Sequence, residues 1–193
     1  VSIHNEESFS EETGCIIPPI FATSTFKHGN KAGFDYTRSG NPNFQILEKS
    51  LKSIEDAKYC TVFGSGISSI TAIASSLTYG DKILCENNLY GCTIRMFEKV
   101  FKKFGLQIYY IDFTKKESIQ KIEEINPTLI WLESPTNPLL KVLDIKKICN
   151  KANSKKIPVV VDNTFCTAIS QRPLELGATI SIISTTKFIN GHS

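Results

Sequence analysis

The stretch IPVVVDN, residues 157–163, is the clearest sign of the fold class. Its apolar residues follow one another without polar interruption, which predicts a strand buried on both faces. Apolar residues at helical spacing precede it over 143–155, and a second apolar run, ATISIIST over 178–185, follows it. Strands of this kind that alternate with helices indicate a mostly parallel sheet with helices on both faces, and hence an α/β fold.

The same alternation continues towards the N-terminus. It predicts strands over 57–63, 81–87, 106–112 and 127–134, and helices over 44–56, 67–79, 93–104, 116–125 and 173–177. Asn43 is a plausible N-cap of the first helix. Residues 1–43 are rich in Gly, Pro, Ser, Thr and Asn and show little periodicity, so we expect an extended arm with turns there. The α/β domain then occupies residues 44–193.

The composition narrows the classes of function. Hydrophobic residues make up 41% of the 193 residues, charged residues 21%, and the net charge is +3, as in an ordinary soluble globular protein. No basic stripe indicates nucleic acid binding, and no apolar run is long enough to span a membrane. The 6 cysteines form neither a zinc motif nor a secreted disulfide framework, and no signal peptide is recognisable at Val1. We therefore expect buried thiols, no metal and a cytoplasmic location.

Polar and small residues stand where the predicted strands end. Because the carboxyl ends of parallel strands meet at one edge of a sheet, where ligands bind, we expect these residues to lie together. They are Gly64, Ser65, Gly66, Asn137, Asp162, Ser184, Thr186 and Lys187. Taken singly, each has an ordinary structural alternative: residues 64–66 as a tight connection, Asp162 as the cap of the next turn, and Lys187 as a surface lysine.

Taken together, these residues describe a site for pyridoxal 5'-phosphate (PLP). A desolvated lysine such as Lys187 becomes a nucleophile that forms a Schiff base. A buried aspartate such as Asp162 is the partner that a pyridinium nitrogen needs. A helix N-terminus with neighbouring hydroxyl groups binds a phosphate.

A dinucleotide site is the competing interpretation. GSGISS, residues 64–69, also reads as G-x-G-x-x-S, and Glu86 follows ~20 residues later, as in a dinucleotide-binding fingerprint. Ser69 stands where that fingerprint usually has Gly or Ala. A nicotinamide cofactor would also leave Asp162 and Lys187 without a role, which favours the PLP interpretation.

Seven motifs carry a resemblance to a known family. They are YTRSGNPN (36–43), FGSGISS (63–69), NNLYGCT (87–93), LESPTNP (132–138), VVDNTFCT (160–167), QRPLELGA (171–178) and STTKFINGHS (184–193). In order and spacing, from about Thr13 to the last residue, the chain resembles the Cys/Met-metabolism family of PLP-dependent enzymes: cystathionine γ-synthase, cystathionine γ-lyase and methionine γ-lyase. The resemblance implies the aspartate-aminotransferase-like large domain, known as fold type I.

The resemblance also implies roles for the matching residues. Lys187 would hold the cofactor covalently and then shuttle protons, and Asp162 would keep the ring nitrogen protonated. Tyr90 would stack on the ring, although without the resemblance it could be an ordinary turn aromatic. Asn137 would hydrogen-bond the ring hydroxyl oxygen. For His192 we expect a structural hydrogen bond beside Lys187.

The resemblance implies a phosphate site shared between subunits. Within one chain, the phosphate would be held by Ser65, Gly66, Ile67, Ser184 and Thr186. Tyr36 and Arg38 would complete this site in the neighbouring subunit of a dimer, because arginine binds phosphate with two parallel hydrogen bonds. The arm would thus reach into the partner, and pairs of such dimers would form a homotetramer.

The implied reaction takes place at the γ-carbon of an amino acid: cystathionine, an O-acylhomoserine, methionine or cysteine. Elimination and replacement stay open as alternatives. Cys92 stands where methionine γ-lyases tend to carry cysteine and the other members glycine, whereas residues 36–42 and 47–60 look closer to the cystathionine enzymes. Asn43 and Ile67 depart from the usual Thr and from the usual Met or Leu.

Family subunits continue for about as long again beyond the part that matches. The continuation contains a small C-terminal domain and the arginine that binds the substrate carboxylate. We therefore expect this chain to be a fragment without the small domain and inactive alone. A non-catalytic remnant that acts only in folding or assembly is the third interpretation.

Overall fold

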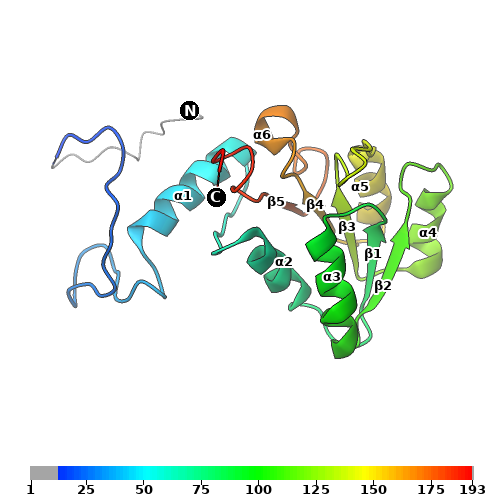
Figure 1. Ribbon diagram of the computed structural model, residues 1–193, viewed down its shortest axis with the longest axis horizontal. Helices are drawn as coiled ribbons and strands as arrows, with labels where there is room; N and C mark the ends of the chain where they lie inside the picture. Colours follow the sequence, from blue (N-terminus) through cyan, green and yellow to red (C-terminus); the bar gives the residue numbers. More distant parts are fainter. Residues whose placement is uncertain (1–12, 193) are drawn as a thin grey trace. The chain divides into compact units, whose positions relative to one another are not determined.

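The computed structural model describes residues 13–192. The chain divides into two compact units between Val62 and Phe63, called unit 1 and unit 2 from here on. Each unit has its own internal packing, and Figure 1 labels their elements along the chain. The helix that the sequence analysis placed at the start of the α/β domain belongs to unit 1.

Unit 1 contains the helix α1 (Pro42–Glu55). Its N-cap is Asn41, whose side chain accepts a hydrogen bond from the Asn43 backbone, so the predicted cap at Asn43 is wrong by two residues. The reason is Pro42, which suits the first helical position because its missing N–H has no partner there. The Asn43 side chain instead bonds the backbone N and O of Phe21.

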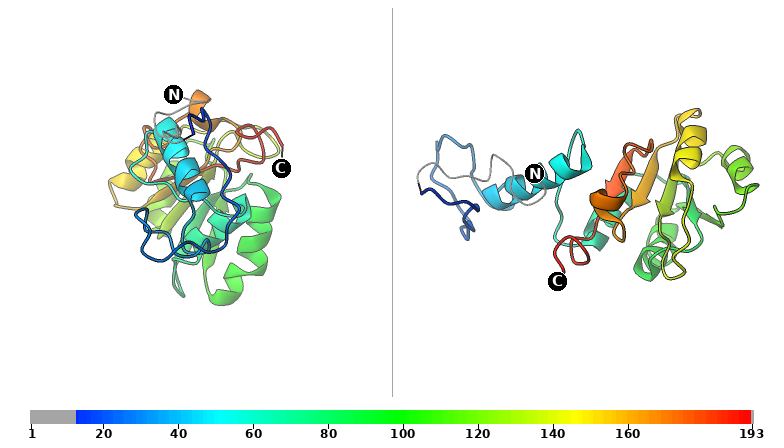
Figure 2. Two further views of the ribbon diagram at one scale, coloured as in Figure 1. Left: turned by 90° about the vertical axis from the view of Figure 1, so that its left-hand side faces the viewer. Right: turned by 90° about the horizontal axis from the view of Figure 1, so that it is seen from above.

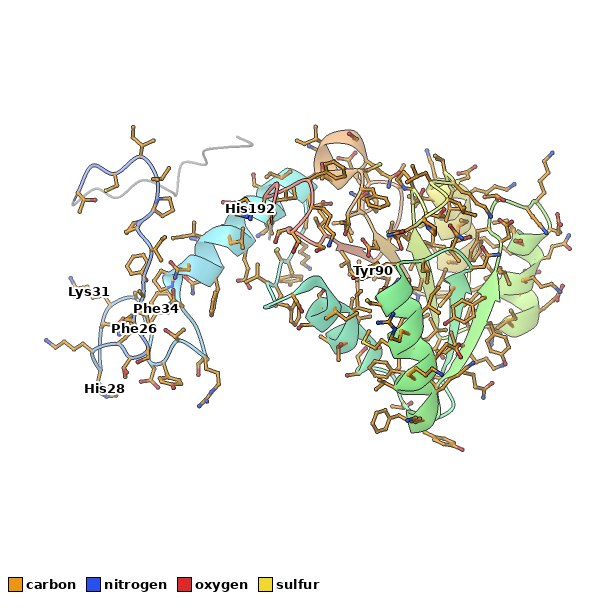
Figure 3. All side chains as sticks on the ribbon, viewed as in Figure 1. Phe26, His28, Lys31, Phe34, Tyr90 and His192 are labelled. Atoms are coloured by element: carbon orange, nitrogen blue, oxygen red, sulfur yellow. The ribbon has the colours of Figure 1, made fainter. Side chains whose placement is uncertain are left out.

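The segment before α1 folds back on itself. An isolated antiparallel bridge joins Thr25 to Tyr36, and the rings of Phe26 and Phe34 lie with their centroids 5.2 Å apart (Figure 3). These few contacts leave most of its side chains exposed.

The predicted strand over 57–63 is wrong. Residues 57–63 form no strand, and Tyr59 and Phe63 are exposed. The Val62 N–H donates to the carboxylate of Glu48 on α1 rather than to a neighbouring strand. An apolar run of strand-like composition becomes a strand only where another strand pairs with it.

Unit 2 contains the predicted parallel sheet. Its order is β2-β1-β3-β4-β5, and every neighbouring pair is parallel. The strands are β1 (Lys82–Glu86), β2 (Gln107–Ile111), β3 (Leu129–Glu133), β4 (Val159–Asp162) and β5 (Ile180–Ile182). The sequence prediction of these five strands is confirmed, with bounds that are shorter by one to three residues at each end.

Helices connect the strands. They are α2 (Gly66–Ala74), α3 (Gly91–Lys99), the 3-10 helix η2 (Phe101–Phe104), α4 (Ser118–Ile125), α5 (Ile145–Asn153) and α6 (Thr167–Ser170). The predicted helix over 173–177 is wrong: the segment forms turns that end at Gly177 with a φ of 98°. The short helix α6 was not predicted, since four residues carry no periodic signal.

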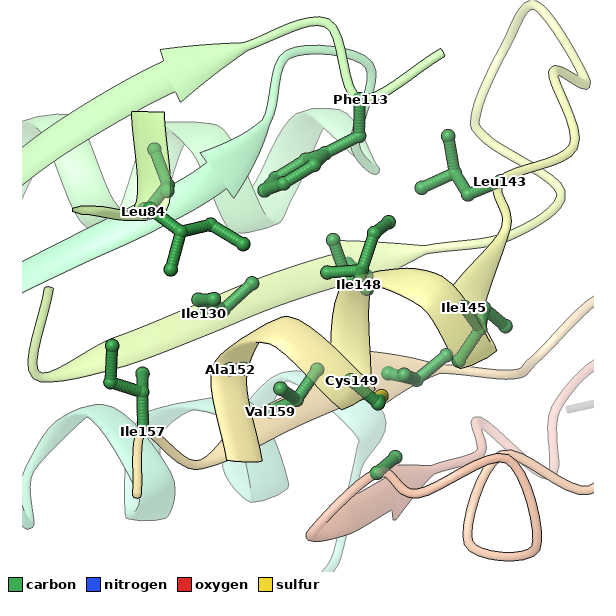
Figure 4. Close-up of a cluster of buried hydrophobic side chains, with 14 residues drawn as sticks. Leu84, Phe113, Ile130, Leu143, Ile145, Ile148, Cys149, Ala152, Ile157 and Val159 are labelled. Atoms are coloured by element: carbon green, nitrogen blue, oxygen red, sulfur yellow. The ribbon is translucent and has the colours of Figure 1, made fainter. Parts of the chain in front are cut away.

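Two apolar layers cover the two faces of the sheet. Residues of α4 and α5 pack on one face against Leu84, Ile130 and Val159 (Figure 4). Residues of α2, α3 and η2 pack on the other face against Ile83 and Trp131. The right-hand view of Figure 2 shows α3, in green, and α5, in yellow, on opposite sides of the strands. The predicted three-layer α/β arrangement is therefore confirmed.

Three strands end in acidic residues at the same edge of the sheet. Glu86 ends β1, Glu133 ends β3 and Asp162 ends β4, and Glu133 and Asp162 are partners in the strand register. All three are buried. Among the described residues, no helix has the length and apolar character needed to cross a membrane.

Candidate active site

A cavity of about 220 Å³ opens at this carboxyl edge of the sheet. Residues from the starts of α2 and α3 and from the ends of β3, β4 and β5 line it. They are Ser65, Gly66, Ile67, Ile70, Tyr90, Glu133, Asn137, Asp162, Thr164, Phe165, Ile182, Ser184, Thr186 and Lys187. The structure thus brings together the nine candidate cofactor-binding residues of unit 2, and their individual roles stay predictions.

The start of α2 forms one wall. Ser65 is its N-cap, and the Ser65 hydroxyl accepts a hydrogen bond from the Ser68 N–H at 3.2 Å. A Cβ atom placed on Gly66 would lie 3.1 Å from the Ser184 Cβ and 3.2 Å from the Ser184 hydroxyl oxygen. A larger residue would require α2 or Ser184 to move by a few tenths of an ångström, so glycine suits this close approach of α2 to the end of β5. The first turn contains no acidic residue, so its positive dipole end stays available to an anion.

Asp162 provides a buried carboxylate at the end of β4. Its Oδ1 accepts hydrogen bonds from the Thr164 N–H at 3.0 Å and from the Thr164 hydroxyl at 2.6 Å. No hydrogen bond from the described residues engages Oδ2. Burial raises the pKa of Asp162, and the bonds from Thr164 and the charge of Lys187 oppose this rise. Asp162 thus caps the next turn, as its structural alternative predicted, and it also lines the cavity; its pairing with a ring nitrogen stays a prediction.

Thr164 was missed by the sequence analysis. It donates its hydroxyl to Asp162, and the same oxygen accepts the Ser184 N–H at 2.9 Å. Thr164 therefore ties the end of β4 to the segment that carries the predicted phosphate ligands. The signal was present as the D-x-T sequence after an apolar strand, in which a hydroxyl bonds a carboxylate two residues earlier.

Lys187 lies in the turns that follow β5. Its backbone N–H donates to the Ser184 carbonyl oxygen, and its carbonyl oxygen accepts from the Gly191 N–H at 2.7 Å. Its Nζ lies 6.0 Å from the centroid of the Tyr90 ring. The side chain is exposed, so the expected desolvation of this lysine is wrong for this structure. The physical reason is that Lys187 follows the last strand in a surface turn, outside the two apolar layers.

Tyr90 and Glu133 meet through the backbone. Tyr90 precedes α3, where Figure 3 labels its exposed ring, and its N–H donates to the Glu133 Oε2 at 2.6 Å. Burial, and then the charge of Asp162, raises the pKa of Glu133 to about 8. Hydrogen bonding to Cys92 raises the pKa of the Tyr90 hydroxyl. Glu133 was missed, because a glutamate at a strand end has the same sequence signal as the structural Glu86.

Asn137 lies in the loop after β3. Its N–H donates to the Asn88 carbonyl oxygen at 3.3 Å, and the Thr136 hydroxyl donates to the Asn88 side chain at 3.2 Å. The peptide bonds before Pro135 and Pro138 are cis. This loop brings Asn137 to the cavity, as the proline-bracketed motif predicted.

Tyr36 and Arg38 belong to unit 1. The Arg38 guanidinium carbon lies 5.0 Å from the centroid of the Tyr36 ring, a cation–π distance. Both side chains are exposed. Their part in a phosphate site of a neighbouring subunit stays a prediction.

The dinucleotide alternative is not favoured. Glu86, which would bind the ribose, is buried inside the protein, and its carboxylate accepts the backbone N–H groups of Asn88 and Phe113. The segment before the Gly-Ser-Gly turn is also not a strand, so the strand–turn–helix context of that fingerprint is lacking.

Comparison with known proteins places the chain in a family. The family model described as Cys/Met metabolism PLP-dependent enzyme matches residues 1–193. The chain belongs to this family. PLP is the cofactor of the Cys/Met metabolism enzymes, and the cavity fits it through the buried carboxylate of Asp162 and the close approach of Gly66 to Ser184.

The relatives that match this chain are named for different reactions. It is 44% identical over 184 residues to the putative cystathionine gamma-lyase 2 of Caenorhabditis elegans, an alignment that covers 92% of this chain and 47% of that protein. It is 40% identical over 195 residues to the probable cystathionine gamma-synthase of Herpetosiphon aurantiacus, with coverage of 100% and 61%. The chain spans about half the length of the curated relatives it matches.

A solved structure of the family has the same fold. The apo form of CalE6, a methionine gamma lyase from Micromonospora echinospora, matches with a TM-score of 0.90 at 36% sequence identity. The match covers 95% of this chain and 50% of that chain. Both the parallel sheet and the helices on its faces are therefore family features.

Proposed function

We propose that the protein acts in PLP-dependent transsulfuration, by γ-elimination from a sulfur amino acid or γ-replacement on an activated homoserine. One observation carries the proposal: the buried Asp162 carboxylate, the Lys187 amine and the start of α2 line the same cavity. Family membership supports the cofactor, and the names of the relatives support the substrate class, which is cystathionine, an O-acylhomoserine, methionine or cysteine.

Each wall of the cavity has a task in this proposal. Bound PLP supplies an electron-withdrawing ring that stabilises negative charge on the substrate carbon atoms. Asp162 holds a proton at the ring nitrogen, and Asn137 orients the ring through its hydroxyl oxygen. Lys187 carries the cofactor and afterwards moves protons at the α- and β-carbons of the substrate. Tyr90 covers one face of the ring.

The phosphate group is held at the start of α2. The backbone N–H groups of Gly66 and Ile67, in the first turn of α2, would bind phosphate oxygens, and the hydroxyls of Ser65, Ser184 and Thr186 would donate to them. Residues 1–43 form an arm that extends to a neighbouring subunit, where Tyr36 and Arg38 complete the phosphate site. The assembly we propose is a homotetramer made of two such dimers, with shared sites.

The free cysteines support a cytoplasmic location as part of the proposal. All six lie within the described residues and are unpaired, and Cys85 and Cys149 are buried. Protein thiols in this state are typical of a reducing compartment.

Covalent labelling tests the proposal. The chain is mixed with PLP, reduced with borohydride to make any attachment to lysine permanent, and digested for mass spectrometry. Label on Lys187 alone is the expected result. Label spread over surface lysines, or none, in both this chain and the longest product of its gene would overturn the enzyme interpretation and leave the non-catalytic one.

The type of γ-reaction is tested on the longest gene product. Release of keto acid and ammonia from cystathionine or methionine identifies elimination. Formation of cystathionine from an O-acylhomoserine and cysteine identifies replacement. Activity in neither assay, with Lys187 labelled, would contradict the substrate class while leaving the cofactor site in place.

A further inference from the structure

Two carboxyl groups lie side by side at the cavity. Glu133 and Asp162 are register partners at the ends of β3 and β4, both are buried, and both line the cavity. Two buried carboxylates at this spacing repel each other, so the site favours one charge over two. The question is which of the two groups keeps its proton.

The surroundings of the two groups differ. Asp162 accepts two hydrogen bonds from Thr164 and is attracted by Lys187, and both effects stabilise its charged form. Glu133 accepts one hydrogen bond, from the Tyr90 backbone, and faces the charge of Asp162. The titratable groups that line the cavity with Glu133 are Tyr90 before α3, Asp162 on β4 and Lys187 after β5. Burial disfavours the charge of either group, but Asp162 has more partners that stabilise it, so Glu133 is the one of the two that keeps its proton.

The hydrogen bond from the Tyr90 backbone N–H indicates what Glu133 does in the site. Tyr90 makes no side-chain cap for α3, and 39% of the residue is exposed, so burial alone does not fix its position. Its backbone N–H is anchored instead by Glu133 at 2.6 Å. The preceding residue, Leu89, is buried in the apolar layer and keeps the chain folded at this point independently of Glu133.

We infer that Glu133 is a positioning residue: as a neutral acid, it anchors the Tyr90 backbone so that the ring stays over the cofactor, without placing a second negative charge beside Asp162. This inference rests on the proposed cofactor site. An ionised Glu133 would instead place a second negative charge beside Asp162 and make it harder for Asp162 to keep its own charge. An apolar residue would leave the Tyr90 N–H without its acceptor.

Two substitutions of Glu133 distinguish its role as acceptor of the Tyr90 N–H from the effect of its charge. Glu133→Gln keeps an oxygen that accepts the Tyr90 N–H but cannot ionise, so the dissociation constant of PLP, measured from absorbance, should stay within ~3-fold of the wild-type value. Glu133→Leu removes the acceptor and should weaken PLP binding ~10-fold. Glu86→Gln is the matched control, a buried strand-end glutamate outside the cavity, and should leave PLP binding unchanged.

A readout without cofactor tests the same inference. The backbone amide resonance of Tyr90 in the NMR spectrum of the PLP-free chain should shift with pH near the pKa of Glu133, which is about 8, and this shift should vanish in Glu133→Gln. A Tyr90 amide that is insensitive to pH in this range, or equal PLP affinity of Glu133→Leu and wild type, would overturn the inference. If Glu133→Gln bound PLP as weakly as Glu133→Leu does, the inference that Glu133 acts as a neutral acid would be refuted. Wild-type protein that never carries PLP on Lys187 would instead overturn the proposed function, and the amide titration still decides the role of Glu133.

Discussion

Glu86 and Asp162 occupy similar places in the sheet but differ in what they do. Each ends a buried apolar strand and is itself buried, with 0% and 7% of its surface exposed. The Glu86 oxygens are both used, one by the Asn88 N–H and the other by the Phe113 N–H. In Asp162, Thr164 uses Oδ1, and among the described residues no hydrogen bond occupies Oδ2. A buried carboxylate at a cavity that has one oxygen without a hydrogen-bond donor indicates a ligand site. A buried carboxylate whose two oxygens both accept backbone hydrogen bonds indicates a role in stabilising the fold.

The largest expected effect follows from removing the charge at Asp162. Asp162→Asn keeps an oxygen for the two Thr164 hydrogen bonds but gives the ring nitrogen no anionic partner. We expect PLP affinity to fall ~100-fold, which corresponds to about 3 kcal/mol, because one member of a buried charge pair is lost. Titration of the chain with PLP, followed by absorbance, measures the change.

The control for Asp162→Asn is the thermal unfolding midpoint of the PLP-free variant, which should stay close to that of the wild type. Unchanged PLP affinity in a folded variant would remove the distinction between Asp162 and Glu86.

The next largest effect concerns Glu86 and falls on stability. Glu86→Ala leaves the part-buried Asn88 N–H and the buried Phe113 N–H without acceptors. Each loss costs ~1 kcal/mol, so we expect the free energy of unfolding to fall by about 2 kcal/mol. Urea unfolding measures it. Under conditions where the variant is folded, borohydride should still label Lys187. A variant that is folded and as stable as wild type but unable to bind PLP would assign Glu86 to the site.

The pH dependence of stability sharpens the comparison of strand-end carboxyls. Burial raises the pKa of Glu133 from 4.5 to about 8, so between these values the native state holds a proton that the unfolded state has lost. This stabilisation is fully present below pH 4.5 and is lost as pH rises towards 8, with a slope of at most about 1.4 kcal/mol per pH unit. Glu86 and Asp162, whose pKa values are also raised, contribute in the same direction.

Urea unfolding of the PLP-free chain at several pH values between 5 and 8 measures this slope. Glu133→Gln should flatten it, since that side chain cannot titrate. An equally steep slope in the variant would show that Glu133 does not hold its proton in the native state.

Much of the fold and part of the site could be predicted from the sequence. Apolar runs alone predicted the five parallel strands, and the ends of these strands predicted that Asn137, Asp162 and Lys187 lie together, because parallel strands bring their carboxyl ends to one edge. The sequence did not separate Glu133 from Glu86, since both are glutamates after a buried run. Which of them faces the cavity depends on where neighbouring loops turn, and that is a property of the folded chain.

Other differences have the same origin. The run over 57–63 has strand-like composition but no partner strand, and Lys187 is exposed although its motif indicated a desolvated amine. Both predictions were wrong because pairing and burial depend on residues distant in the sequence, which a local pattern does not contain. Propensity is a weak indicator where burial depends on tertiary contacts.

The smallest expected effect distinguishes two glycines at the start of α2. A Cβ on Gly66 would come within 3.1 Å of the Ser184 Cβ, whereas a Cβ on Gly64 would meet nothing within 4 Å, and neither glycine has a positive φ that alanine would strain. Gly66→Ala should push α2 away from Ser184 by a few tenths of an ångström and weaken PLP binding several-fold, to ~10-fold at most, since misplaced hydrogen-bond donors lose part of their strength. Gly64→Ala is the control and should bind PLP as the wild type does. Equal affinities for both variants would mean that the phosphate does not depend on the contact between α2 and the end of β5, and the unused oxygen of Asp162 would then be left as the main evidence for the cofactor's position.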